Sequence, residues 1–166
     1  KLTVPGVPDI YQGCELWDFS LVDPDNRRPV DFKKRKEYVK ELGKLSPEQI
    51  MQRMDEGLPK LWLIRQVLNL RAQNPEVFGP RGDYKPITVT GKFAGHILAF
   101  SRSGAVVTIT PRLIHHVNNK WLDTNIELPA GNWTNILTET PVIGGPVKIK
   151  DLFKIFPVAL LKKESE

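Results

Sequence analysis

The sequence predicts an α+β fold in which a helical region, up to about residue 80, precedes a region of short β-strands. Two observations indicate this order. Apolar residues recur at three- and four-residue steps between residues 58 and 73, which is the period of a buried helix face. From about Tyr84, short apolar runs alternate with Gly, Pro and Asn, which is typical of an antiparallel β-sandwich.

The first 32 residues show neither period, and we expect them to form a loop. Prolines and glycines interrupt them, and carboxylates, arginines and aromatic rings are crowded between these breaks. A stretch of this length without regular structure is usually functional when it lies in a compact domain. We interpret it as a βα loop whose strand lies at or before Lys1, and the chain as the tail of a larger enzyme.

Three helices are expected after this loop. The first covers residues 32–42. Ser46 and Gln49 have the spacing of a capping box, so they start a second helix, which ends near Gly57. The third helix covers residues 58–73, where the apolar period is clearest.

Seven short strands follow, each bounded by Gly, Pro or Asn. Residues 101–104, Ser-Arg-Ser-Gly, lie between two apolar runs and predict a hairpin turn. The expected strands are Ile87–Thr90, Ile97–Ser101, Ala105–Thr110, Asn125–Leu128, Trp133–Leu137, Val147–Ile149 and Phe156–Leu161.

Composition excludes several classes of function. Hydrophobic residues make up 40% and charged residues 26%, which suits a globular protein, and no apolar run is long enough to span a membrane. The net charge of +5 permits nucleic acid as a partner without indicating it. The basic residues between positions 27 and 44 alternate with Glu37 and Glu41, which favours a solvated helix face over a nucleic-acid site.

Metal and disulfide chemistry are not expected either. The single cysteine, Cys14, cannot form an internal disulfide, which favours a reducing cytoplasm. His96, His115 and His116 lack partners at metal-ligand spacing. We therefore expect a cytoplasmic protein with no metal site, no nucleic-acid partner and no membrane partner.

The side chains of the first loop support two interpretations. Five carboxylates could include a reacting pair, roughly 5 Å apart for a retaining glycosidase, or could form turns and bind substrate. Arg27 and Arg28 could bind sugar hydroxyls or brace the loop through ion pairs. Trp17 or Tyr11 could stack on a sugar ring or pack in a core. The carboxylates are Glu15, Asp18, Asp23, Asp25 and Asp31.

The beginning of the chain resembles a known family. Residues 3–13, Thr-Val-Pro-Gly-Val-Pro-Asp-Ile-Tyr-Gln-Gly, resemble the segment around the eighth barrel strand of the α-amylase superfamily, glycoside hydrolase family 13. Within it, residues 13–31, with their Asp-Pro-Asp-Asn-Arg-Arg-Pro block, look most like the maltooligosyl trehalose synthase family. Four further segments share this likeness, at residues 60–65, 121–124, 128–133 and 156–161.

The resemblance implies a domain organisation. Residues 1–80 would be the end of an incomplete (β/α)8 TIM barrel, and residues 81–166 a C-terminal all-β domain. The parent enzyme would convert the reducing-end α-1,4 bond of a maltooligosaccharide to an α,α-1,1 bond by intramolecular transglycosylation, without a cofactor. Its partners would be the rest of the barrel, the maltooligosaccharide substrate and a separate trehalohydrolase in the cytoplasm.

The resemblance also implies which residues bind sugar. In related enzymes the Asp and Arg of an Asp-Pro-x-x-Arg loop contact glucose units, and this spacing falls on Asp23 and Arg27. Weaker candidates are Asn26, Arg28, Tyr11 and Gln12. The motifs that carry the family's catalytic acids have no match here, so no catalytic residue is expected and the chain alone should be inactive.

Alternatives remain at this point. The chain could be a fragment of another α-glucan-active enzyme of the superfamily, a stand-alone carbohydrate-binding β module or a basic nucleic-acid binder. The third helix would normally cover a barrel sheet, so we expect its apolar face to be exposed and to self-associate or pack onto the strands. That face consists of Leu61, Trp62, Ile64 and Leu68.

Overall fold

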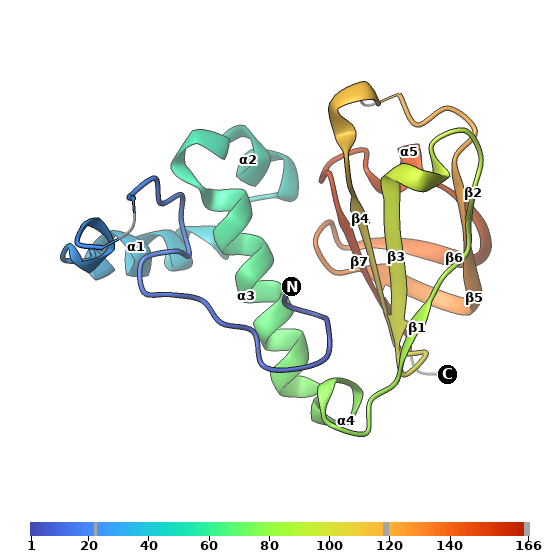
Figure 1. Ribbon diagram of the computed structural model, residues 1–166, viewed down its shortest axis with the longest axis horizontal. Helices are drawn as coiled ribbons and strands as arrows, with labels where there is room; N and C mark the ends of the chain where they lie inside the picture. Colours follow the sequence, from blue (N-terminus) through green and yellow to red (C-terminus); the bar gives the residue numbers. More distant parts are fainter. Residues whose placement is uncertain (22, 118–119, 165–166) are drawn as a thin grey trace.

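A computed structural model describes residues 1–21, 23–117 and 120–164. Figure 1 shows helices α1 to α3 on one side of the molecule and the strands on the other, with the N-terminal segment running beside the longest helix. The helical half ends with α4 at Phe78, and the strand half begins at Tyr84. The strand half also contains the short helix α5 (Ile149–Leu152) and the 3-10 turns η3 (Ala94–His96) and η4 (Ile114–His116). The division into two domains near residue 80 stays a prediction. Within the described residues, no helix combines the length and apolarity that crossing a membrane requires.

The helices follow the sequence signals closely. Helix α1 spans Phe32–Leu42 and helix α3 spans Leu58–Gln73, as predicted. Helix α2, Pro47–Gln52, begins with the predicted capping box between Ser46 and Gln49. The predicted second helix is too long, because α2 ends at Gln52 and a separate 3-10 turn, η2, follows it. Two shorter elements complete this half: the 3-10 turn η1 (Asp25–Arg27) in the first loop and helix α4 (Pro75–Phe78). The turn η2 spans Met54–Glu56.

The strand half is a seven-stranded antiparallel sheet with the order β1-β3-β4-β7-β5-β2, and β6 pairs with β5. The predicted hairpin between β3 and β4 is confirmed, with Ser103 and Gly104 at positive φ in its turn. The two strands predicted at residues 125–128 and 133–137 form one strand, β5, whose register shifts between Leu128 and Asn132. The bounds are β1 Tyr84–Pro86, β2 Val89–Thr90, β3 Ile97–Arg102, β4 Val106–Pro111, β5 Asn125–Asn135, β6 Thr140–Lys148 and β7 Ala159–Lys163.

The expected two-sheet sandwich is instead one strongly curled sheet. The short segment at residues 84–90 pairs with β3 at its start, through Tyr84 and Arg102, and with β5 at its end, through Val89 and Ile126. The same piece of chain therefore borders both ends of the strand order and brings them together. A buried cluster that includes Val107, Ile126, Trp133 and Leu161 fills one side of the strands.

A second buried cluster joins the helices to the strands. Helix α3 contributes Leu61, Trp62 and Ile64 to it, and the strand half contributes Leu137 and Leu160 among others. The indole N–H of Trp62 donates to the carbonyl oxygen of Leu137 at 3.0 Å.

Of the outcomes expected for the α3 face, packing onto the strands is therefore confirmed for three of its four residues, and the expected exposure is wrong for these three. Leu61, Trp62 and Ile64 are 5–8% exposed, and Leu68 alone is 40% exposed. The reason is that the chain's own strands cover this face. Self-association stays a prediction.

Two arginines tie the first residues to this shared core. Arg102, on β3, is 1% exposed and donates to the carbonyls of Thr3 at 2.8 Å and Asp83 at 2.9 Å. Arg71, on α3, donates to the carbonyl of Leu2 at 3.0 Å. Because a buried guanidinium must be satisfied by acceptors, these bonds fix the N-terminal segment against both α3 and β3.

Candidate functional site

The first loop folds back on itself and encloses a polar cleft of about 570 Å³. Residues from both limbs of the loop line it, and Arg35 of α1 contributes from the side. Ionisable groups of both signs face this cleft together with two aromatic rings. Its lining includes Gln12, Trp17, Asp18, Phe19, Asp25 and Arg28.

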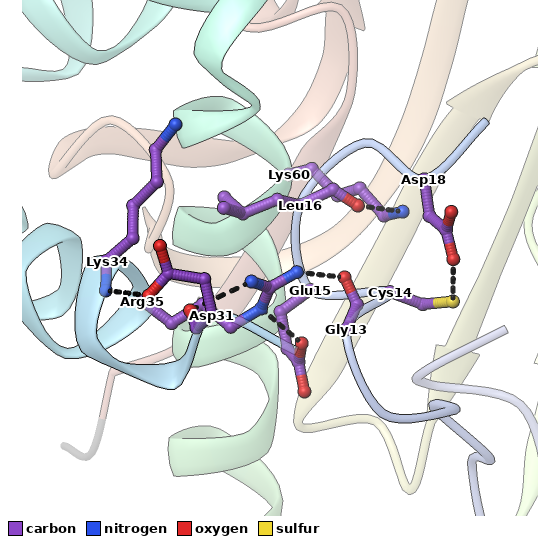
Figure 2. Close-up of polar contacts among 9 residues, drawn as sticks. All are labelled: Gly13, Cys14, Glu15, Leu16, Asp18, Asp31, Lys34, Arg35 and Lys60. Atoms are coloured by element: carbon purple, nitrogen blue, oxygen red, sulfur yellow. Dashed lines mark hydrogen bonds and ion pairs between the residues drawn. The ribbon is translucent and has the colours of Figure 1, made fainter. Parts of the chain in front are cut away.

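Arg35 fastens the two ends of the loop together (Figure 2). Its guanidinium donates to the carbonyl of Gly13 at 2.5 Å, to the Glu15 carboxylate at 3.2 Å and to the carbonyl of Asp31 at 3.1 Å. The Arg35 side chain is 18% exposed, so these bonds are partly shielded from water. The side chain of Asp31 in turn accepts a bond from the backbone N–H of Lys34 and caps α1. The start of α1 therefore sets the shape of the cleft.

A second anchor comes from α3. The ammonium of Lys60 donates to the carbonyl of Leu16 at 2.9 Å (Figure 2) and lies 5.4 Å from the ring centre of Trp17. The indole N–H of Trp17 donates to the carbonyl of Met54 at 2.6 Å. The loop is thus held by α1 at its ends and by η2 and α3 in its middle.

Asp18 carries negative charge into the cleft. Its carboxylate accepts bonds from the hydroxyl and the backbone N–H of Ser20, and these bonds lower the pKa of Asp18 below its ordinary value. The thiol of Cys14 also donates to Asp18, at 3.6 Å (Figure 2). Burial, followed by that hydrogen bond, raises the pKa of Cys14. The thiol is therefore protonated at neutral pH, and Asp18 is an ionised acceptor.

The two strongest sequence candidates form an ion pair with each other. Arg27 donates two hydrogen bonds to Asp23, at 3.1 and 2.6 Å, and both side chains are more than half exposed. Neither residue lines the cleft. Arg28 donates one hydrogen bond to Asp25, at 2.7 Å. The bracing interpretation of these arginines therefore describes the structure, and sugar contact by Asp23 and Arg27 stays a prediction.

Two of the four weaker candidates line the cleft. Gln12 and Arg28 line it, whereas Tyr11 is 47% exposed and does not. Asn26 lies in the turn η1, and its side chain is outside the part that the structure describes. Trp17, Asp18 and Asp25 also line the cleft. The sequence offered Trp17 for stacking and both aspartates for turns, a reacting pair or substrate binding, but none of the three was among the chosen sugar contacts.

Three carboxylates of the loop lie in ion pairs with arginines. Asp25 pairs with Arg28 and Glu15 with Arg35, as Asp23 does with Arg27. Among residues 1–21, 23–117 and 120–164, no three His, Cys, Asp or Glu side chains gather as metal ligands would. The arrangement suits recognition of a polar, uncharged ligand by hydrogen bonds.

Comparison with known proteins gives a consistent result. No protein-family model matches the chain. Proteins of two Mycobacterium tuberculosis strains, both named putative maltooligosyl trehalose synthase, are 39% identical to it over 165 residues. The match covers 99% of this chain and 20% of those relatives.

Solved structures agree with the sequence match. The maltooligosyltrehalose synthase of Arthrobacter ramosus superposes with a TM-score of 0.85 at 36% identity, covering 98% of this chain and 21% of that one. A second maltooligosyl trehalose synthase structure gives a TM-score of 0.73 at 29% identity, covering 98% and 20%. The resemblance found in the sequence is therefore confirmed: the chain is a homologue of the maltooligosyl trehalose synthases and spans about a fifth of their length.

Proposed function

We propose that this chain is the C-terminal part of a maltooligosyl trehalose synthase, a (1→4)-α-D-glucan 1-α-D-glucosylmutase. The observation that carries the proposal is the 39% identity over 165 residues, supported by a TM-score of 0.85 to the Arthrobacter ramosus enzyme. The intact protein would move the reducing-end α-1,4 bond of a maltooligosaccharide to an α,α-1,1 bond. This isomerisation belongs to trehalose biosynthesis, and a trehalohydrolase would consume the product in the cytoplasm.

In this proposal the chain binds the glucan, and the reacting acids belong to the rest of the barrel. Carboxylates of the first loop support this division, because Glu15, Asp23 and Asp25 each face an arginine. A retaining mechanism needs one carboxylate free to attack and one that can hold a proton. Paired carboxylates serve neither role well, since a neighbouring guanidinium occupies their oxygens.

Asp23 and Arg27 remain our proposed sugar contacts at the outer edge of the loop. The carboxylate holds the guanidinium through two bonds, which leaves the remaining N–H donors of Arg27 pointing in a fixed direction. Arg27→Ala in the intact enzyme should raise KM or lower kcat clearly. An unchanged kcat/KM would remove Arg27 from the contacts.

The overall proposal is tested with the intact gene product and with this chain. The intact protein should form maltooligosyl trehalose from maltopentaose, seen as loss of reducing ends without release of glucose. The 166-residue chain alone should form none. Hydrolysis without transglycosylation by the intact protein would indicate another α-glucan-active enzyme of the superfamily, and product formation by the isolated chain would contradict the division of roles.

A further inference from the structure

Trp17 is held more firmly than an exposed loop side chain usually is. Its indole N–H donates to the carbonyl of Met54 at 2.6 Å, which fixes the rotation of the ring. Lys60 lies over the ring at 5.4 Å and binds the preceding carbonyl, that of Leu16. The ring nevertheless remains 41% exposed. A side chain that is held in one rotamer while its ring stays exposed has already lost the rotamer entropy that ligand binding would otherwise remove.

The backbone around Trp17 is also built for close contact. Gly57 connects η2 to α3 with a φ of +80°. A Cβ atom at Gly57 would lie 3.0 Å from the backbone nitrogen of Trp17 and 3.3 Å from the Cα of Leu16. The absence of a side chain at Gly57 therefore allows the loop to rest directly on the start of α3 and places Trp17 at the wall of the cleft.

The groups around the open part of the ring favour a neutral polyol. Asp18 offers an ionised carboxylate to the cleft, and Gln12 offers both donors and an acceptor. Arg28 is already paired with Asp25, and Arg35 is paired with Glu15. The cleft is lined by three aspartates and by two arginines that are already paired, so it has little attraction for an anion. Hydroxyl groups, in contrast, can bond to every one of these groups.

We propose that Trp17 is a stacking platform for one glucosyl ring of an α-1,4-glucan. The C–H groups on one face of a pyranose would lie on the indole, and hydroxyls at its edge would bond to Asp18 and Gln12. This inference rests on the proposed function for the kind of sugar, and it adds a binding residue that the Asp-Pro-x-x-Arg motif does not contain. An aromatic face with polar groups at its rim is the arrangement in which aromatic side chains bind amphipathic ligands.

The chain offers a direct optical test of this platform. It has four tryptophans, and Trp62, Trp121 and Trp133 are at most 7% exposed, so acrylamide quenching of fluorescence reports mainly on Trp17. Saturating maltopentaose should reduce the quenching constant of the 166-residue chain at least about twofold, because the sugar covers the exposed ring face. Sorbitol, which has hydroxyls but no ring face, and inorganic phosphate should leave it unchanged. An unchanged quenching constant with maltopentaose, or protection by phosphate instead, overturns the proposal.

Variants separate stacking from bracing of the loop. Trp17→Phe keeps a ring but loses the bond to Met54, and Trp17→Leu loses the ring. In the intact enzyme, Trp17→Leu should raise KM for maltopentaose about tenfold with a smaller change in kcat, and Trp17→Phe should restore most of the affinity. Tyr84→Leu is the matched control, because Tyr84 is 42% exposed and packs on Phe100 of the strand half.

The outcomes distinguish this inference from the proposed function. If the intact protein forms no maltooligosyl trehalose but maltopentaose still protects Trp17, the platform stands and the proposed reaction fails. If the intact protein is active while Trp17→Leu has the KM of the wild type, the platform fails alone. If Trp17→Phe and Trp17→Leu lose kcat equally with KM unchanged, Trp17 braces the loop and does not bind sugar.

Discussion

At the scale of single residues, Arg53 organises the contact between α1 and η2. Its guanidinium donates to Glu56 at 2.5 and 2.6 Å and to Glu41 at 2.6 Å, and the hydroxyl of Tyr38 donates to Glu56 at 2.8 Å. These bonds, chiefly that from Arg53, lower the pKa of Glu56 from 4.5 to about 2. Since η2 also supplies the carbonyl that holds Trp17, this cluster supports the wall of the cleft.

The depressed pKa of Glu56 predicts a pH-dependent contribution to stability. A carboxylate whose pKa is lower in the folded protein stabilises the fold above its unfolded pKa, near 4.5, and loses that effect as pH falls toward 2. Glu56→Gln should therefore lower Tm at pH 7, and the difference from the wild type should disappear by about pH 2. Calorimetry across this range measures it, and a difference that stays constant down to the lowest pH would contradict the assigned cause.

Arg35 makes a second prediction at this scale. It binds Gly13, Glu15 and Asp31 while only 18% exposed, so Arg35→Gln leaves several partly buried acceptors without their charged donor. We expect a loss of about 2 kcal/mol in the free energy of unfolding and faster hydrogen exchange within residues 13–31. Lys36→Gln, at the exposed next position on α1, is the control and should change neither. Equal exchange in both variants would show that Arg35 does not fasten the loop.

The candidate site was only partly accessible from the sequence for reasons visible at single residues. The Asp-Pro-x-x-Arg motif sets Asp23 and Arg27 four positions apart, and the two side chains form the ion pair that the sequence offered as one alternative. Trp17 and Asp18 line the cleft through bonds to Met54 and Ser20, and the bond to Met54 spans 37 positions. Local spacing carries no information about a contact of that range. The clustering of aromatic and acidic residues in the first loop was the signal for Trp17 and Asp18. It did not indicate which of the clustered side chains line the cleft.

At the scale of elements, the helices were predictable where their ends carry chemical signals. The bounds of α1 and α3 agree with the sequence, and the capping box at Ser46 sets the start of α2. The early end of α2 was not predictable, because Gln52 and Arg53 carry no breaker, and the contacts of Arg53 with Glu41 and Glu56 favour a 3-10 turn there. The curled sheet escaped prediction because residues 84–90 pair with two strands distant in sequence.

Gly57 provides a prediction for the junction between η2 and α3. Gly57→Ala introduces a side chain at φ +80° and a Cβ 3.0 Å from the nitrogen of Trp17. We expect a loss of about 1–3 kcal/mol in the free energy of unfolding, from backbone strain and displacement of the loop together. The acrylamide quenching constant should change as well, because the displaced loop moves the ring of Trp17 and changes its exposure.

Two glycines of the strand half serve as controls that separate backbone strain from displacement of the loop. Gly104 has a φ of +63° with open space where the methyl group of an alanine would lie, so Gly104→Ala measures strain alone, and Gly95→Ala has open space without the positive φ. Gly104→Ala should lose about 1 kcal/mol without changing the quenching of Trp17. If Gly57→Ala and Gly104→Ala cost the same and leave quenching equally unaffected, close approach of the loop has no part in the effect.

At the scale of the whole molecule, the helical and strand halves share one buried cluster. Trp62 of α3 donates a hydrogen bond to Leu137 in the strand half, and Arg102 of β3 donates one to Thr3 in the N-terminal segment. In the intact protein this arrangement would let the strands support the segment that leads into the first loop. The sequence indicated the two halves by their different periods. It offered packing of α3 onto the strands only as one alternative, because the apolar stripe of α3 could pack equally well against a barrel sheet or against this sheet.

This shared cluster predicts that the chain unfolds as one cooperative unit. Far-UV circular dichroism reports on the helices, and near-UV dichroism reports on Trp121 and Trp133 in the buried cluster of the strands, so the two thermal transitions should coincide. Trp62→Phe removes a buried hydrogen bond to Leu137 and should shift both transitions down together, at a cost of about 2 kcal/mol. Trp17→Phe removes a similar bond at a site that is 41% exposed and should cost clearly less, because water can replace the donor. A helical transition that moves in Trp62→Phe while the strand transition stays fixed would mean that the two halves fold independently and that the strands do not hold the loop in place.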